Sequence, residues 1–76
     1  MTYNRERAAD LTMALMYLSI HDGTRVWKGY EWDVLNFLHE RGLTSNPRSK
    51  SKSVVLTEEG EAKSKEMFAK YLAAAA

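Results

Sequence analysis

The sequence predicts a mainly α-helical α+β fold, in the order helix, helix, two-stranded hairpin, helix. Three observations predict it. Apolar residues recur at helical spacing in three segments, a glycine ends the second segment, and a short alternating stretch follows a polar, basic turn. A chain of 76 residues makes one domain, which we place at residues 1–76, with 73–76 as a frayed tail.

The first helix is expected to begin after Asn4, a good N-cap, and to end at Ser19 or Ile20. One of its apolar faces holds Ala8, Leu11, Leu15 and Leu18. A second holds Ala9, Met13, Met16 and Ile20, joined by Tyr17. A helix that is apolar nearly all round needs cover on both sides. Either the last helix or another copy of the chain supplies the second cover, so the sequence offers Met13, Met16 and Tyr17 as candidates for contact with a partner.

The middle of the chain is predicted to form a connector followed by a second helix. Gly23 suits a left-handed position after the first helix, and residues 24–28 form an extended piece or a single turn. The second helix is expected over residues 30–41, with Leu35 and Leu38 at the centre of its apolar face. Gly42 ends it.

The hairpin is expected to pair Leu43–Ser45 with Lys52–Leu56. Alternation places Val54 and Leu56 on the core side, and Ser53 and Val55 on the other. Thr57 then caps the last helix. One face of that helix contains two small residues that permit close packing, followed by larger apolar ones: Gly60, Ser64, Met67, Phe68, Tyr71 and Leu72.

Composition narrows the classes of function. Cysteine is absent, which excludes disulfides and thiolate zinc sites and fits the cytoplasm. No signal pattern precedes the first helix, and the uncharged run 11–20 is too short to span a bilayer, so we expect a cytoplasmic protein without a membrane partner. The net charge of +1 leaves any electrostatic attraction to local clusters.

One such cluster lies in the turn of the hairpin. Residues 46–52, here called the wing, contain Arg48, Lys50 and Lys52 with Ser49 among them and no acid. Cations with hydroxyl and amide donors at a hairpin tip suit contacts with phosphates, to which Arg25 and Lys28 would add. The alternative is a solvated turn whose lysines protect the sheet edges from aggregation.

Acidic residues on the second helix argue against contacts with phosphates. Glu31, Asp33 and Glu40 precede any cation there, so that helix would present carboxylates to the phosphates of DNA. A simpler explanation for Glu31 and Asp33 is that their negative charges stabilise the positive N-terminal end of the helix dipole.

Aromatic residues cluster beside the connector. Trp27, Tyr30 and Trp32 surround Lys28 and Gly29. We expect Trp32 in the core. Either Trp27 packs beneath the loop, or it stays exposed and, with Tyr30, anchors a partner protein or a second protomer.

Nothing in the sequence predicts catalysis. His21-Asp22 and His39-Glu40 are the histidine–acid neighbours, and adjacent residues on a helix do not face each other. No nucleophilic residue or third metal ligand lies at a sequence spacing typical of a catalytic or metal site, and no glycine-rich phosphate loop occurs. We therefore expect no enzyme, no metal and no cofactor.

Two resemblances add to this interpretation. The back half resembles the recognition helix, wing and exit helix of winged-helix regulators of the MarR and PadR types, in Leu35-x-x-Leu38-His39-Glu40-Arg41-Gly42-Leu43 and Val54-Val55-Leu56-Thr57-Glu58-Glu59-Gly60. It departs from them between Ile20 and Tyr30, where there is no room for the usual bracing helix. Nearly the whole chain also resembles a family of small bacterial proteins known only as a domain of unknown function, in Trp27-Lys28-Gly29, Trp32-Asp33, Leu35, Leu38-His39, Gly42-Leu43, Pro47, Lys50 and Lys52-Ser53-Val54-Val55-Leu56-Thr57-Glu58-Glu59-Gly60.

The resemblance to the regulators implies a winged-helix-like fold and a regulatory role on double-stranded DNA. Two hypotheses follow. In the first, the wing contacts the DNA backbone. In the second, the same fold is a protein-interaction module, an adaptor or inhibitor that forms homo-oligomers and reads no DNA.

Overall fold

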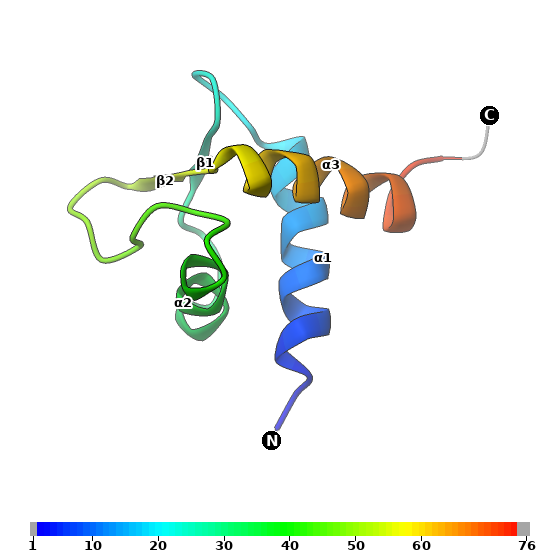
Figure 1. The fold of residues 1–76 in the computed structure, drawn as a ribbon, viewed down its shortest axis with the longest axis horizontal. Helices are drawn as coiled ribbons and strands as arrows, with labels where there is room; N and C mark the ends of the chain where they lie inside the picture. Colours follow the sequence, from blue (N-terminus) through cyan, green and yellow to red (C-terminus); the bar gives the residue numbers. More distant parts are fainter. Residues whose placement is uncertain (1, 75–76) are drawn as a thin grey trace.

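A computed structural model describes residues 2–74, and confirms the predicted class. It contains α1 (Arg5–Leu18), β1 (Arg25–Trp27), α2 (Trp32–Glu40), β2 (Ser53–Val55) and α3 (Glu58–Tyr71). Helix α3 crosses α1, with α2 and the strands on one side of α1 and the end of α3 on the other (Figure 1). Residues 75–76 of the predicted tail lie outside the described residues.

Both helix caps expected from the sequence are present. The Asn4 side chain accepts a hydrogen bond from the Arg7 amide at 3.0 Å. The Thr57 hydroxyl accepts one from the Gly60 amide at 3.0 Å and donates one to the Gly42 carbonyl at 2.7 Å. Thr57 therefore caps α3 and also ties its start to the end of α2.

The sheet differs from the predicted hairpin. Strand β2 pairs with β1, antiparallel, with Val26 opposite Val54 and Trp27 opposite Ser53. The extended alternative for residues 24–28 is thus the correct one, and no helix occupies that stretch. The partner strand of β2 is therefore β1, and not Leu43–Ser45 as the sequence predicted.

The predicted strand Leu43–Ser45 is wrong except for a single bridge between Thr44 and Leu56. A side chain limits the ladder there. The Ser45 hydroxyl accepts the Val55 amide at 2.9 Å, a role that a backbone carbonyl would play in a longer strand. Pro47 follows closely and has no amide hydrogen to continue the pairing.

A tight turn leads from α1 into β1. His21 and Arg25 exchange two backbone hydrogen bonds, of 2.9 and 3.0 Å. Between them Asp22 and Gly23 have positive φ angles of 44° and 88°. Glycine adopts this backbone conformation without strain, as the sequence predicted for Gly23.

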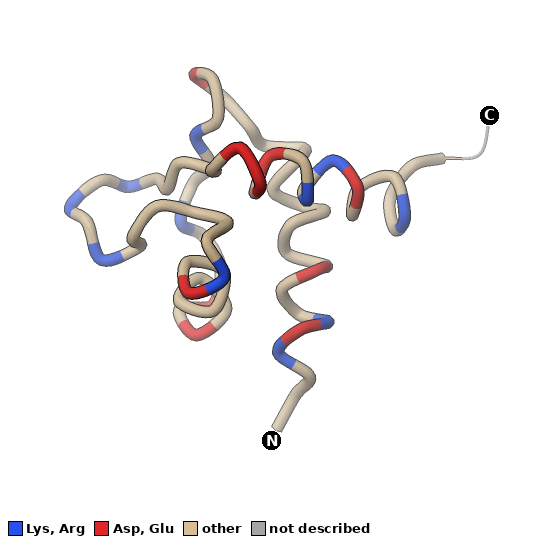
Figure 2. The backbone as a smooth tube through the Cα atoms, in the orientation of Figure 1, with Lys and Arg blue, Asp and Glu red and all other residues tan. Residues whose placement is uncertain are grey.

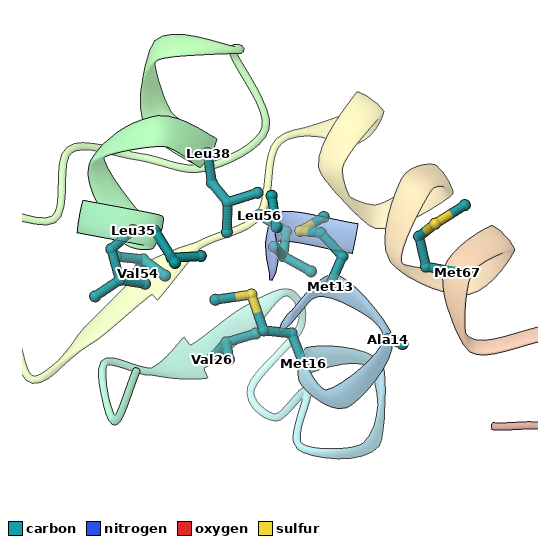
Figure 3. Packing of buried hydrophobic residues seen from close by; sticks show 11 residues of the cluster. Met13, Ala14, Met16, Val26, Leu35, Leu38, Val54, Leu56 and Met67 are labelled. Atoms are coloured by element: carbon teal, nitrogen blue, oxygen red, sulfur yellow. The ribbon is translucent and has the colours of Figure 1, made fainter. Parts of the chain in front are cut away.

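The core lies between α1, α2, α3 and the inner face of the sheet (Figure 3). Met13 and Met16 are fully buried and lie near Leu56 and Val26. Their assignment to a partner-binding face is therefore wrong: the methionine face of α1 is the one that the domain itself covers. Val54 and Leu56 are buried as expected.

The other apolar face of α1 is left open. Leu11, Leu15 and Leu18 are 43%, 46% and 64% exposed. They stand on one side of the helix because residues four and seven positions apart share a face. Within residues 2–74 no element of the fold buries this stripe, which we call the leucine stripe.

The start of α3 packs closely on the segment after α2. An added Cβ at Gly60 would overlap the Leu43 carbonyl oxygen and lie 2.8 Å from its carbon. Ser64, one turn further, is fully buried. These two residues confirm the close packing that their size predicted. Within residues 2–74, none of the helices has the length and apolarity required to cross a membrane.

Candidate nucleic-acid interface

The wing carries basic residues without an intervening acid (Figure 2). Arg48, Lys50 and Lys52, the wing cations, are all exposed. The ion pairs among residues 2–74 join Arg5 to Asp33 and Arg41 to Glu6. The wing cations take part in neither, so their charge is available to an external anion.

The wing has a fixed path despite its polar composition. Pro47 is fully buried and anchors the loop to the body of the domain. The Asn46 side chain accepts the Arg48 amide at 2.9 Å, and its carbonyl accepts the Ser49 amide at 3.3 Å. Such an Asx turn presets the backbone on which the cations are displayed.

Lys28 joins the wing to the sheet. Its ammonium donates to the Ser49 carbonyl at 2.7 Å, and its amide donates to the Lys52 carbonyl at 3.0 Å. A lysine ammonium has three donor hydrogens, so this contact leaves capacity for a phosphate. The predicted site residues Lys28 and Ser49 therefore lie together with the wing cations.

Arg25 extends the basic surface across the outer face of the sheet. It is exposed, and its Nη1 donates to the Ser53 hydroxyl at 3.3 Å. Ser53 is only 6% exposed although it faces away from the core residues Val26 and Val54. The guanidinium lies over the strand and covers it, so Arg25 is close to the base of the wing.

The acidic residues of α2 have structural partners. Asp33 accepts a hydrogen bond of 2.6 Å from the Tyr3 hydroxyl and forms an ion pair of 3.1 Å with Arg5. Glu31 is the N-cap of α2. Asp33 thus joins α2 to the N-terminus, and Glu31 caps α2, so two of the three carboxylates that opposed phosphate binding have a structural role. Glu40 remains exposed.

A shallow depression separates α2 from the wing. Its lining mixes charges, with Asn36, His39 and Glu40 on one side and Asn46 and Arg48 on the other. The His39 ring is held by a contact of 2.9 Å between its Nδ1 and the Thr44 carbonyl. Because this surface is not uniformly basic, the wing and the outer sheet face are the better candidates for a phosphate site.

The Tyr3–Asp33 hydrogen bond has a measurable consequence. Donation to this carboxylate raises the pKa of Tyr3 above its ordinary value of 10.0. The neutral phenol is therefore favoured in the folded state. Its contribution to stability is complete below the unfolded pKa and is lost as pH rises through the folded pKa.

We expect Tyr3→Phe to remove one component of the tyrosine absorbance titration. The wild-type-minus-variant difference isolates the Tyr3 phenolate, whose midpoint should lie above 10.0. Asp33→Asn, which removes the charge of the acceptor, should move that midpoint down. A difference titration centred at the ordinary tyrosine value would contradict the hydrogen bond.

The aromatic candidates divide between surface and core. Trp27 is 56% exposed, which decides between its two predicted positions. Trp32 is 48% exposed, so the expectation that it lies in the core is wrong. It is the first residue of α2 and lies at the edge of the face that buries Val34, Leu35 and Leu38. Tyr30 is half-buried against the core, and Tyr17 packs on Phe68 with ring centroids 5.0 Å apart.

Sequence reasoning missed one feature of this region, the stack of Trp27 on His21. The ring centroids are 4.4 Å apart and the planes are inclined by 25°. The available signal was the Asp22-Gly23 turn, because such a pair between extended residues favours a tight reversal that brings flanking side chains together. Among residues 2–74, no three histidine, cysteine or carboxylate side chains group as metal ligands would.

The fold and the placement of its basic residues define a small α+β protein of winged-helix-like order. Residues 4–74 match the family described as Domain of unknown function (DUF6429), and the chain belongs to that family. Over 68 residues it is 43% identical to the uncharacterized protein y4hR of Sinorhizobium fredii (strain NBRC 101917 / NGR234), a match covering 90% of this chain and 92% of that protein. No solved structure matches significantly.

Proposed function

We propose that this protein binds nucleic acid, and specifically the phosphate backbone of double-stranded DNA, as a non-enzymatic regulatory protein of the bacterial cytoplasm. The observation that carries the proposal is the gathering of five basic side chains around the wing, free of acidic partners. They are Arg25, Lys28, Arg48, Lys50 and Lys52.

Three of these cations stand on a loop whose path is already fixed. The buried Pro47 and the Asn46 turn reduce the conformational entropy that the wing would lose on binding. Contacts of this kind position a protein on DNA without reading its sequence. Helix α2 contributes little to reading, since Glu31 and Asp33 occupy its leading end with structural bonds.

The proposal is tested by titrating the protein into a fluorescently labelled duplex and following anisotropy. Binding should be evident at low salt, should depend little on base sequence, and should weaken steeply as salt is added. A duplex whose anisotropy does not change at low salt, up to the highest soluble protein concentration, would rule the proposal out.

A second candidate function, self-association, is favoured by the leucine stripe. Ala8, partly buried against the core, precedes it, and the spacing of Ala8, Leu11, Leu15 and Leu18 alternates three and four residues, as in the seam of a coiled coil. Leu15 and its neighbours lie opposite the buried Met13, so a partner helix can approach without disturbing the core.

The charges at the two ends of α1 favour a second copy in antiparallel orientation. The first turn carries Arg7, which is exposed and forms no ion pair within residues 2–74. The last turn has no basic residue, and the exposed Asp22 follows it. An antiparallel copy brings each Arg7 to the negative end of the other helix, near Asp22.

We expect this dimer to be weak and to dissociate on dilution. Three partly exposed leucine side chains offer less apolar area than the roughly 800 Å² per partner of a standard stable interface. Leu15→Lys should shift sedimentation velocity profiles fully to monomer, because it places a charge in the seam. Leu72→Lys, at an exposed leucine beyond α3, is the matched control and should sediment like the wild type. A wild-type chain that is monomeric at every concentration would exclude this candidate.

A further inference from the structure

Trp27 presents an exposed indole in the middle of the basic surface. It lies on the outer face of the sheet with Arg25, because residues two apart on a strand share a face. Its partner across the ladder is Ser53, which Arg25 contacts, and the next residue, Lys28, reaches the wing. A planar ring is thus set among cations that the proposed function assigns to phosphates.

The indole is held in place by His21. The two rings stack at a centroid distance of 4.4 Å as a diagonal pair, since His21 is bridged to Arg25, two residues before Trp27. The His21 ring is itself fixed by a contact of 3.1 Å between its Nδ1 and the Ser19 carbonyl. One face of the indole is therefore covered, while Trp27 as a whole remains 56% exposed.

The remaining surface suits a flat aromatic group attached to phosphates. A base in a duplex is already stacked on both sides, so it does not offer a face to an indole. An unpaired base does, and any base can stack on an aromatic side chain because every base has a π-face. An aromatic platform beside a basic track is the arrangement by which proteins bind single strands without sequence preference.

We propose that Trp27 is a stacking platform for an unpaired base, so that the full ligand is a DNA duplex with an adjoining single-stranded segment. This proposal rests on the proposed function, because the wing cations supply the phosphate contacts on either side. Asp22, the acid next to His21, lies in the turn between His21 and Arg25.

The chain contains its own control for the stacking step. Trp32 is exposed to a similar extent, 48% against 56% for Trp27. Its sequence neighbours, however, are Glu31 and Asp33. An exposed indole in an acidic setting should contribute nothing to nucleic-acid binding. Comparing variants of the two tryptophans therefore distinguishes base stacking at Trp27 from non-specific hydrophobic binding.

The test uses two labelled single strands of about 12 nucleotides, oligothymidine and an oligomer of abasic sites with the same phosphates. Trp27→Leu should weaken binding of oligothymidine by about tenfold and leave binding of the abasic strand unchanged. Trp32→Leu should bind both strands like the wild type. Equal affinity of wild type and Trp27→Leu for oligothymidine would overturn the inference.

A spectroscopic measurement keeps the native indole and so does not depend on how Trp27→Leu folds. In Trp32→Phe the tryptophan fluorescence comes from Trp27 alone, and oligothymidine should quench it whereas the abasic strand should not. Absence of quenching overturns the inference. Emission that changes instead with protein concentration, without nucleic acid, would place Trp27 in a protein interface and overturn it as well.

The two proposals fail in different ways. If alanine at the three wing cations abolishes binding of both strands while Trp27→Leu changes nothing, the result supports the phosphate site and contradicts the stacking platform. If neither strand nor a duplex binds the wild type at low salt, both fall together.

Discussion

Replacing Arg48, Lys50 and Lys52 together with alanine is expected to reduce the affinity for duplex DNA by about a hundredfold at 0.1 M salt. The three side chains are exposed and form no ion pair within residues 2–74. Each phosphate that they neutralise releases condensed counterions, which supplies most of the free energy of non-specific binding. The substitution removes that release.

The salt dependence gives a sharper measurement than the affinity itself. If all three cations contact phosphates, the slope of log K against log salt should become less negative by about 2.7 in the variant. The melting temperature should change little, because exposed side chains away from the core contribute within about 0.5 kcal/mol. Anisotropy titrations at several salt concentrations measure the slope.

A control with the same change in charge is available on α3. Both the wing variant and Lys63→Ala/Lys65→Ala/Lys70→Ala change the net charge from +1 to 1 − 3 = −2. If the wing acts through local contacts, the control should retain most of the wild-type slope. Equal losses in the two variants would show that overall charge alone, and not the wing, drives binding.

Replacing Gly60 with alanine is expected to destabilise the domain by about 1–2 kcal/mol, the balance of an overpacking cost and a gain in helix propensity. The added methyl group would overlap the Leu43 carbonyl, which is backbone and cannot rotate away. That carbonyl also accepts the Thr57 amide at 3.0 Å, so any displacement strains the junction between α2 and α3. Overpacking of this kind costs about 1–3 kcal/mol, more than the roughly 1 kcal/mol that alanine gains in helix propensity.

The effect should be visible as a lower melting temperature, by about 10 °C for a domain of this size. Gly29→Ala is the matched control, because nothing lies within 4 Å of a Cβ added there. It should melt within a few degrees of the wild type. If Gly60→Ala melts at the wild-type temperature, the close packing between α3 and Leu43 is wrong.

The three helices could be predicted from the sequence because their signals are local. Asn4 and Thr57 are caps with side chains suited to free amides, and Gly42, with φ of 75°, ends α2. The sheet could not be predicted in the same way. Strand β1 has three residues, too few to show a period, and its pairing with β2 is decided by tertiary packing.

Periodicity also could not decide which apolar face of α1 is covered. Leucine is as apolar as methionine, yet Met13 and Met16 are buried and Leu15 is exposed. The choice depends on where α2 and the sheet dock. For the candidate site, the sequence located the wing and its cations. It did not locate the His21–Trp27 stack, which requires the turn that returns the chain onto β1.

The pairing of β1 with β2 makes the two halves of the chain depend on each other. The residues that resemble the regulators all follow Tyr30, whereas the strand that completes their sheet precedes it. Natural relatives should therefore gain or lose the wing only together with the connector strand. Recombination that exchanged the back half alone would leave β2 without its partner strand. The whole domain should therefore be inherited together.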